Sequence, residues 1–87
     1  MKERIGFAGS FDSNDCLVTV KESKDTQIKI DSIVSDYFYD DILSCVKNAI
    51  TESGVKNISV EIQDKGALDF TIRARVLTAI KRFMEEA

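Results

Sequence analysis

Hydrophobic and polar residues alternate along three short stretches of the chain: residues 16–22 (CLVTVKE), 26–31 (TQIKID) and 57–63 (NISVEIQ). Alternation with a period of two is typical of strands that bury one face, so each stretch predicts a strand. Only the polar segment SKD separates the first two stretches, which predicts a β-hairpin. In this hairpin the two valines of the first strand face the same side as the two isoleucines of the second.

The hydrophobic period lengthens over residues 36–52, and this change predicts an amphipathic helix. The apolar residues of this segment follow steps of four, three and four, and they form one stripe: Phe38, Ile42, Cys45 and Ala49. Gly54 lies where a residue in the left-handed conformation would end the helix.

The C-terminal stretch is compatible with two patterns. Its apolar residues up to Ile72 alternate as in a strand, whereas those from Ile72 to Phe83 have helical spacing. The length of the stretch and its content of Arg, Ala, Leu and Lys favour a helix from about Asp69 onward, with Asp69 as its N-cap.

The predicted elements follow in the order ββαβα and form one domain over residues 1–87. Three half-buried strands and two amphipathic helices predict an α+β fold, a two-layer sandwich with a three-stranded sheet and both helices on one face. The helix between the second and third strands makes these two strands parallel. They are either adjacent or separated by the first strand, antiparallel to both. Six apolar residues are expected to be buried together: Ile42, Val46, Val60, Ile62, Val76 and Ile80.

The charge balance limits the classes of partner. Twelve basic and fifteen acidic residues give a net charge of −3, which argues against nucleic acid or an anionic membrane as the main partner. The N-terminal residues contain no long apolar run, so we expect no signal peptide or membrane span, and a cytoplasmic location. There is no histidine, and the two cysteines are far apart, so we expect no metal site and no ordinary catalytic base.

Two predicted turns are rich in aspartate. Asp12 and Asp15 flank Ser13 in the stretch GSFDSNDC, and Asp64 and Asp69 flank KGAL. Paired carboxylates can hold Mg²⁺ or share a proton, but turns and helix starts use Asp routinely, and we favour this structural interpretation. Ser13 has carboxylates beside it but no His or Lys base, so another protein must activate its hydroxyl if it reacts.

Four basic residues lie on the predicted C-terminal helix: Arg73, Arg75, Lys81 and Arg82. One interpretation is a solvated face, with the last pair favourable to the helix dipole. The alternative is that Arg73 or Arg75 closes on a phosphate or a partner carboxylate, which suits the geometry of a guanidinium. The pattern favours the solvated face.

Two stretches, AGSFDSNDCLVTV and DKGALDFTIRARVLTAIKR, resemble the acyl carrier protein, or γ subunit, of citrate lyase. The resemblance implies that a serine in the N-terminal turn carries phosphoribosyl-dephospho-coenzyme A through a phosphodiester link. The matching residue is Ser13, and Ser10 is its rival. Asp12 and Asn14 depart from the residues usual beside that serine in the family.

The resemblance also implies the partners of the chain. A prosthetic-group transferase attaches the arm, the α subunit exchanges the acetyl group on its thiol for a citryl group, and the β subunit cleaves the citryl thioester. The chain itself is then a carrier without catalytic residues. We further predict that DKGALD and the arginines after it dock the carrier on these subunits. Lys65 and Gly66 form a turn in which the glycine can take a positive φ, and the pair that Asp69 and Arg73 could form would stabilise the fold too little to explain the cluster.

Three alternatives stay open. The first is the related carrier subunit of malonate decarboxylase, which uses the same type of arm. The second is an unmodified interaction module in which Ser13 is only a turn residue. A small independent enzyme is the least favoured, because the chain lacks histidine and a Gly-rich phosphate loop.

Overall fold

The computed structural model describes residues 3–86, except for the side chain of Ser35. Four strands and two helices follow along these residues: β1 (Ile5–Gly9), β2 (Cys16–Glu22), β3 (Gln27–Ser32), α1 (Ser35–Ser53), β4 (Ile58–Asp64) and α2 (Asp69–Glu85). All five elements predicted from the hydrophobic pattern are present. The additional element is β1, so the order is βββαβα and the prediction of three strands is wrong.

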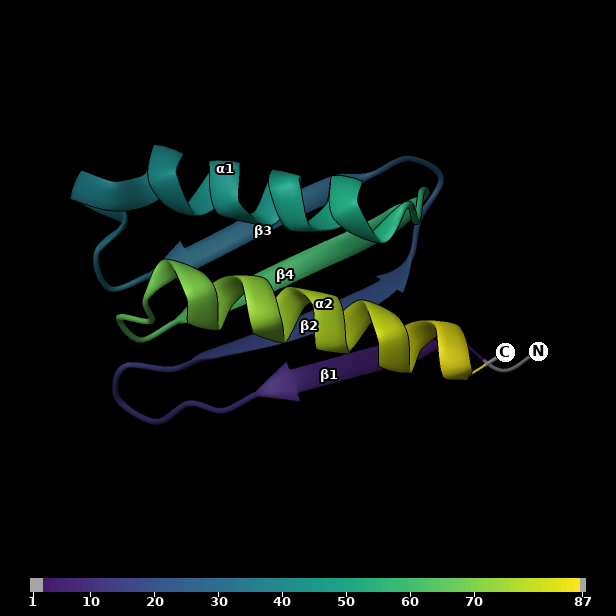
Figure 1. Cartoon of the computed structure of the whole chain (residues 1–87), viewed down its shortest axis with the longest axis horizontal. Coiled ribbons are helices and arrows are strands. Elements are labelled where there is room, and N and C mark those ends of the chain that lie inside the picture. Colours follow the sequence, from purple (N-terminus) through teal and green to yellow (C-terminus); the bar gives the residue numbers. More distant parts are fainter. Residues whose placement is uncertain (1–2, 87) are drawn as a thin grey trace.

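The four strands form one sheet in the order β1-β2-β4-β3, and both helices cover the same face of it (Figure 1). β2 is antiparallel to β1 and to β4, whereas β3 and β4 are parallel. The prediction of a two-layer α+β sandwich is therefore confirmed. Of the two arrangements left open for the strands around the first helix, the structure has the adjacent one.

The predicted hairpin between residues 16–22 and 26–31 is wrong, because β4 lies between these two strands. β4 buries all three of its isoleucine and valine side chains on one face, which makes it the natural centre of the sheet. The segment between β2 and β3 crosses the start of β4, where Ser23 N–H donates to the Asn57 carbonyl and Asn57 N–H donates to Thr26 Oγ1. β2 instead pairs with β1 through the serine-containing turn.

β1 escapes the pattern because its sequence, IGFAG, contains two glycines and does not alternate between apolar and polar residues. Gly6 has a structural role, since a Cβ at this position would lie 2.1 Å from the Ala79 carbonyl oxygen and 2.5 Å from the Phe83 nitrogen. The missing side chain allows α2 to pack directly on the backbone of β1. Gly6 therefore both interrupts the alternation that would have predicted this strand and allows the strand to pack against α2.

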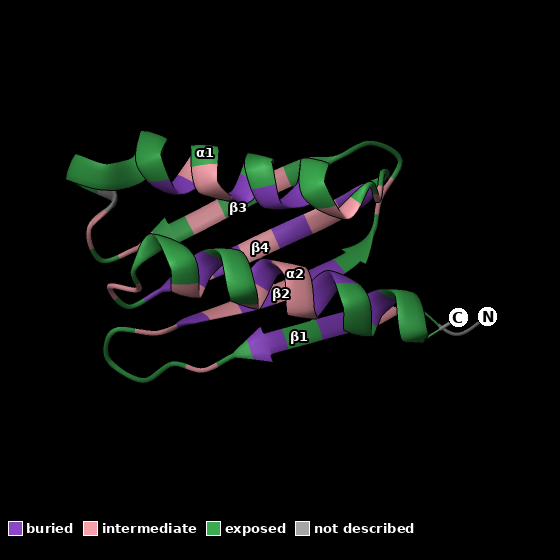
Figure 2. Ribbon diagram, viewed as in Figure 1, coloured by how far each residue is buried: buried purple, intermediate pink, exposed green. Residues whose placement is uncertain are grey.

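The core lies between the sheet and the two helices (Figure 2). The six residues predicted to be buried together all belong to it: Ile42, Val46, Val60, Ile62, Val76 and Ile80. The valines of β2 also face the same side as the isoleucines of β3, because both sets align with Val60 and Ile62 of β4. The face assignments from the sequence are confirmed, although the strand pairing is not.

The two helices agree with the predictions except for the N-cap of α2 and the burial of Phe38 in α1. Gly54 follows α1 with a φ of 72°, as expected, and α2 begins at Asp69. The N-cap of α2 is Leu68, however, so Asp69 is the first helical residue and makes no side-chain cap. Phe38, predicted in the buried stripe of α1, is 51% exposed, because the first turns of α1 extend past the end of β3 (Figure 1).

Candidate functional site

The turn that contains Ser13 joins β1 to β2 and lies at the end of the sheet where β3 and β4 finish (Figure 1). The N–H of Asp15 donates to the Asp12 carbonyl at 3.1 Å, which closes a four-residue turn with Ser13 in its second position. Asn14, in the third position, has a φ of 65°, a conformation that asparagine tolerates better than most residues. The backbone therefore presents Ser13 at the tip of a defined turn.

The loop between β4 and α2, which we call the second loop, is hydrogen-bonded to this turn. Asn14 N–H donates to the Lys65 carbonyl at 2.8 Å, and Lys65 N–H donates to the Asp15 carbonyl at 2.9 Å. Gly66 follows with a φ of 91°, so the prediction of a turn in DKGALD with a left-handed glycine is confirmed. The two stretches that carry the family resemblance, about fifty residues apart in the sequence, are therefore in direct contact.

Asp15 connects the serine turn to helix α2. Its carboxylate accepts hydrogen bonds from Arg75 Nε and from the guanidinium Nη2, each at 3.0 Å. It also accepts from Ser10 Oγ at 2.8 Å and from the Cys16 N–H at 2.7 Å. The hydrogen bonds from Arg75 are the main cause that lowers the Asp15 pKa to about 2 from an ordinary 3.8; those from Ser10 and Cys16 add to this, while burial opposes it. Asp15 is therefore ionised at neutral pH, and it holds the base of the turn.

Asp64 plays the same part for the second loop. It is 2% exposed at the end of β4, and its carboxylate accepts from Ser32 Oγ at 2.7 Å and from the Ala67 N–H at 2.8 Å. The structural interpretation of the aspartates is therefore confirmed for Asp15 and Asp64. Among residues 3–86, no group of three or more acidic, Cys or His side chains is placed to hold a metal ion.

The two candidate serines differ in how their hydroxyls are engaged. Ser10 is half-buried; its Oγ donates to Asp15 and accepts from the Asp12 N–H at 3.2 Å. Ser13 is exposed, and its hydroxyl makes no hydrogen bond to any described residue. Arg75 is occupied by Asp15, and no described side chain forms a hydrogen bond to the Ser13 hydroxyl as a general base would. Among the described residues, the Ser13 hydroxyl is therefore accessible at the surface and has no base bonded to it.

Both arginines of the RAR segment bind carboxylates of this chain. Arg75 closes on Asp15, as described above, and Arg73 Nη2 donates to both oxygens of Glu52 at 2.6 and 2.7 Å. The favoured interpretation of a solvated face holds for Arg73, whose side chain is 56% exposed, and it is wrong for Arg75, which is half-buried against Asp15. An ion pair between Arg73 and Asp69, which their spacing permits, is not the contact that forms. Arg75 is a residue of the site that sequence patterns indicate only as a basic position.

The two cysteines are poor nucleophiles. Cys16 is fully buried, and burial, together with the charges of Asp64 and Asp15, raises its pKa to about 12. Cys45 is half-buried on α1, its Sγ donates to the Asp69 carbonyl at 3.3 Å, and burial raises its pKa as well. Both thiols are therefore protonated at neutral pH and serve as small packing residues.

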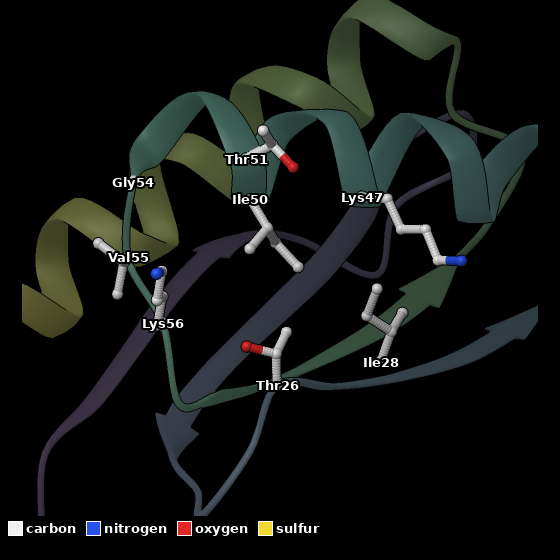
Figure 3. A pocket seen from close by; sticks show the side chains of 8 residues that line it. All are labelled: Thr26, Ile28, Lys47, Ile50, Thr51, Gly54, Val55 and Lys56. Atoms are coloured by element: carbon white, nitrogen blue, oxygen red, sulfur yellow. The ribbon is translucent and has the colours of Figure 1, made fainter.

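A cavity of about 450 Å³ lies at the opposite end of the sheet from Ser13, between α1 and the start of β3 (Figure 3). Its lining combines apolar side chains with two lysines: Thr26, Ile28, Lys47, Ile50, Thr51, Gly54, Val55 and Lys56. It contains no carboxylate, cysteine or histidine, so the lining provides no acid–base pair and no activated nucleophile. This cavity does not change the assignment of the site to the serine turn.

The fold and the site define a class of protein: a small α+β module that presents one free serine on a braced turn and has no catalytic constellation among its described residues. A family model described as malonate decarboxylase delta subunit matches residues 3–83. Curated relatives carry a more specific name. The citrate lyase acyl carrier protein of Halothermothrix orenii is 40% identical over 92% of this chain and 86% of its own length.

Two further relatives have the same name. The citrate lyase acyl carrier protein of Treponema denticola is 40% identical over 97% of both chains, and that of Streptococcus mutans is 44% identical over 92% of this chain and 80% of its own. The chain therefore belongs to the citrate lyase acyl carrier protein family. The resemblance seen in the two sequence stretches is confirmed by these similarities over nearly the whole chain.

One solved structure has a similar fold. A protein from Thermus thermophilus matches the whole chain with a TM-score of 0.61 and 11% identity, and this chain spans only 16% of that protein. At this identity the similarity concerns the fold alone. In the part of the chain that the structure describes, neither helix has the length and apolar character needed to cross a membrane.

Proposed function

We propose that this chain is the acyl carrier subunit of citrate lyase and that Ser13 carries phosphoribosyl-dephospho-coenzyme A through a phosphodiester bond. The observation that carries the proposal is the contrast between the two serines: Ser13 is exposed and its hydroxyl makes no hydrogen bond to a described residue, whereas Ser10 donates to Asp15. Membership of the carrier family supports an acyl cargo. In this proposal the transferase supplies the base for attachment, because no described side chain forms a hydrogen bond to the Ser13 hydroxyl.

In this proposal the chain performs no bond chemistry after loading. The thiol of the arm carries an acetyl group, which the α subunit exchanges for the citryl group of citrate with release of acetate. The β subunit then cleaves the citryl thioester to oxaloacetate and regenerates the acetyl thioester of the carrier. What this chain provides is a rigid base for the arm. Attachment makes each transfer intramolecular, with an effective concentration on the order of millimolar. The braced turn keeps the origin of the arm fixed relative to the rest of the chain.

The proposal places the carrier in the cytoplasm, where thiols stay reduced. Two free cysteines, neither in a disulfide, agree with such a compartment.

A second candidate has one specific observation in its favour. The matching family model is described as a malonate decarboxylase subunit, so the same arm on Ser13 would carry malonyl and acetyl groups instead. The names of the curated relatives favour citrate lyase.

The experiment that tests the function is reconstitution. The carrier is co-expressed with the transferase, loaded with the arm and mixed with the citrate lyase α and β subunits, and oxaloacetate formation from citrate is measured. We expect turnover with wild-type and with Ser10→Ala carrier, and none with Ser13→Ala. If the carrier supports turnover of malonate by malonate decarboxylase subunits but no turnover of citrate, the second candidate function is the correct one. An unmodified mass after co-expression would instead support a plain interaction module.

A further inference from the structure

Both helices begin at the end of the sheet where the turn between β1 and β2 lies (Figure 1). Exposed apolar side chains gather at this end. We call this group the apolar patch, and it has four members: Ile33, Phe38, Leu68 and Phe70, which are 66%, 51%, 62% and 71% exposed. A cavity of about 540 Å³ opens between the first turns of α1 and α2. Three members of the patch line it, Phe38, Leu68 and Phe70, together with Val34, Ile42 and Ala67. Large apolar side chains gathered around one hollow are typical of an interaction site.

The apolar patch is continuous with the serine turn. Gly66, which lines the cavity, lies between the two: a Cβ there would be 3.6 Å from Asn14 Oδ1 and 3.8 Å from Ile33 Cδ1. The residue before it, Lys65, exchanges backbone hydrogen bonds with both residues that follow Ser13. A partner seated on the patch would therefore lie next to the origin of any group attached to Ser13.

The surroundings of the patch are acidic. Residues 33–42 and 64–70 together contain five aspartates and a single basic residue, Lys65. Asp41 and Asp69 line the cavity itself, and Asp36 and Asp40 lie exposed on the same turns of α1. None of these four carboxylates forms an ion pair with a described residue. The complementary surface is therefore an apolar centre with lysine or arginine around it.

We infer that the apolar patch is the surface by which the carrier docks on a citrate lyase subunit, and that the docking site of that subunit is an apolar hollow with a basic rim. This inference rests on the proposed function. It replaces the expectation that the arginines after DKGALD dock, because Arg73 and Arg75 are occupied by Glu52 and Asp15. The apolar and acidic residues around DKGALD contact the partner instead.

The test measures affinity of the carrier for the isolated α and β subunits by biolayer interferometry, with the arm attached and without it. The patch variants are Phe38→Ala and Phe70→Ala for the apolar centre, and Asp41→Asn with Asp69→Asn for the charges. Phe7→Ala is the matched control, because Phe7 on β1 is also 51% exposed but lies outside the patch. Asp31→Asn on β3 controls for the loss of charge.

We expect Phe70→Ala to weaken binding to at least one subunit on the order of tenfold, as truncation of an aromatic anchor does, and Phe7→Ala to leave it unchanged. The double Asn variant should weaken binding at low salt and approach wild type at high salt, since salt screens exposed charges. All the substituted side chains are exposed, so we expect the variants to fold, and circular dichroism verifies this.

Equal affinities of patch variants and controls for both subunits would overturn the inference. So would two other occupants of the patch: a second copy of the chain, seen as dimerisation that Phe70→Ala abolishes, or the arm itself, seen as NMR shifts of Phe38 and Phe70 when the carrier is loaded without any subunit. The binding of unloaded chains distinguishes a failed docking surface from a failed function. A chain that binds through the patch but never accepts an arm refutes only the function.

Discussion

Replacing Arg75 by methionine removes the guanidinium that holds Asp15 and keeps much of the apolar stem of the side chain. The wild-type pair has two hydrogen bonds of 3.0 Å, and hydrogen bonds to charged groups contribute about 1.5–3 kcal/mol when buried. The Arg75 side chain is 42% exposed and that of Asp15 is 15% exposed, so solvent screening reduces this value. We expect Arg75→Met to lower the free energy of unfolding by about 1 kcal/mol.

A double-mutant cycle isolates the pair. Wild type, Arg75→Met, Asp15→Asn and the double variant are unfolded in urea, and we expect a coupling energy of about 1 kcal/mol between the two sites. Arg73→Met is the control on the same helix, because its partner, Glu52, does not contact the turn. Additive effects of the two substitutions, within about 0.3 kcal/mol, would refute the claim that this pair braces the serine turn.

The same pair predicts a pH dependence. The Asp15 pKa is about 2 in the folded chain against an ordinary 3.8, so the ionised carboxylate stabilises the fold at pH values above 3.8. This stabilisation is lost as the pH falls from 3.8 to 2. Wild type should therefore lose more stability over this interval than Asp15→Asn does.

The rate at which the transferase loads the carrier should fall in Arg75→Met but not in Arg73→Met, since only the first substitution loosens the serine turn.

Two further predictions concern the core and use urea unfolding as the measurement. Gly6→Ala should destabilise by about 3 kcal/mol or more, because its Cβ would meet the α2 backbone at 2.1 Å, and a variant as stable as wild type would show that α2 does not pack on β1 in this way. Ile42→Ala and Ile80→Ala should each destabilise by about 2–5 kcal/mol, whereas the exposed Phe70→Ala should change stability by less than about 0.5 kcal/mol; unchanged midpoints for both isoleucine variants would contradict the assigned helix faces.

The hydrophobic pattern predicts the elements of this fold better than their pairing. Alternation along β2, β3 and β4 specifies which side chains face the core, and Val18, Val20, Val60 and Ile62 lie there as expected. Pairing depends instead on which strand is buried deepest, and that depends on contacts between distant residues. A short polar link such as SKD is compatible with a hairpin and with the observed crossing over β4, so the local pattern cannot distinguish them.

The candidate site shows the same division. The open acidic turn and its serines are visible in the sequence, because Gly, Asn and Asp in succession indicate a turn. The physical reason to prefer Ser13 over Ser10 is visible only in the structure, where the Ser10 hydroxyl donates to Asp15 and the Ser13 hydroxyl makes no hydrogen bond to a described residue. The brace from Arg75 joins residues sixty positions apart, and no spacing rule within one helix or strand could have indicated it.

Mass spectrometry of the loaded carrier tests the central claim most directly. Trypsin should release residues 5–21 as one peptide, which contains both Ser10 and Ser13, and fragment ions that end between these two residues locate the arm. The account predicts that the mass of phosphoribosyl-dephospho-coenzyme A appears only on fragments that include Ser13, that Ser10→Ala keeps it and that Ser13→Ala loses it. An arm located on Ser10, or retained by Ser13→Ala, would contradict the account.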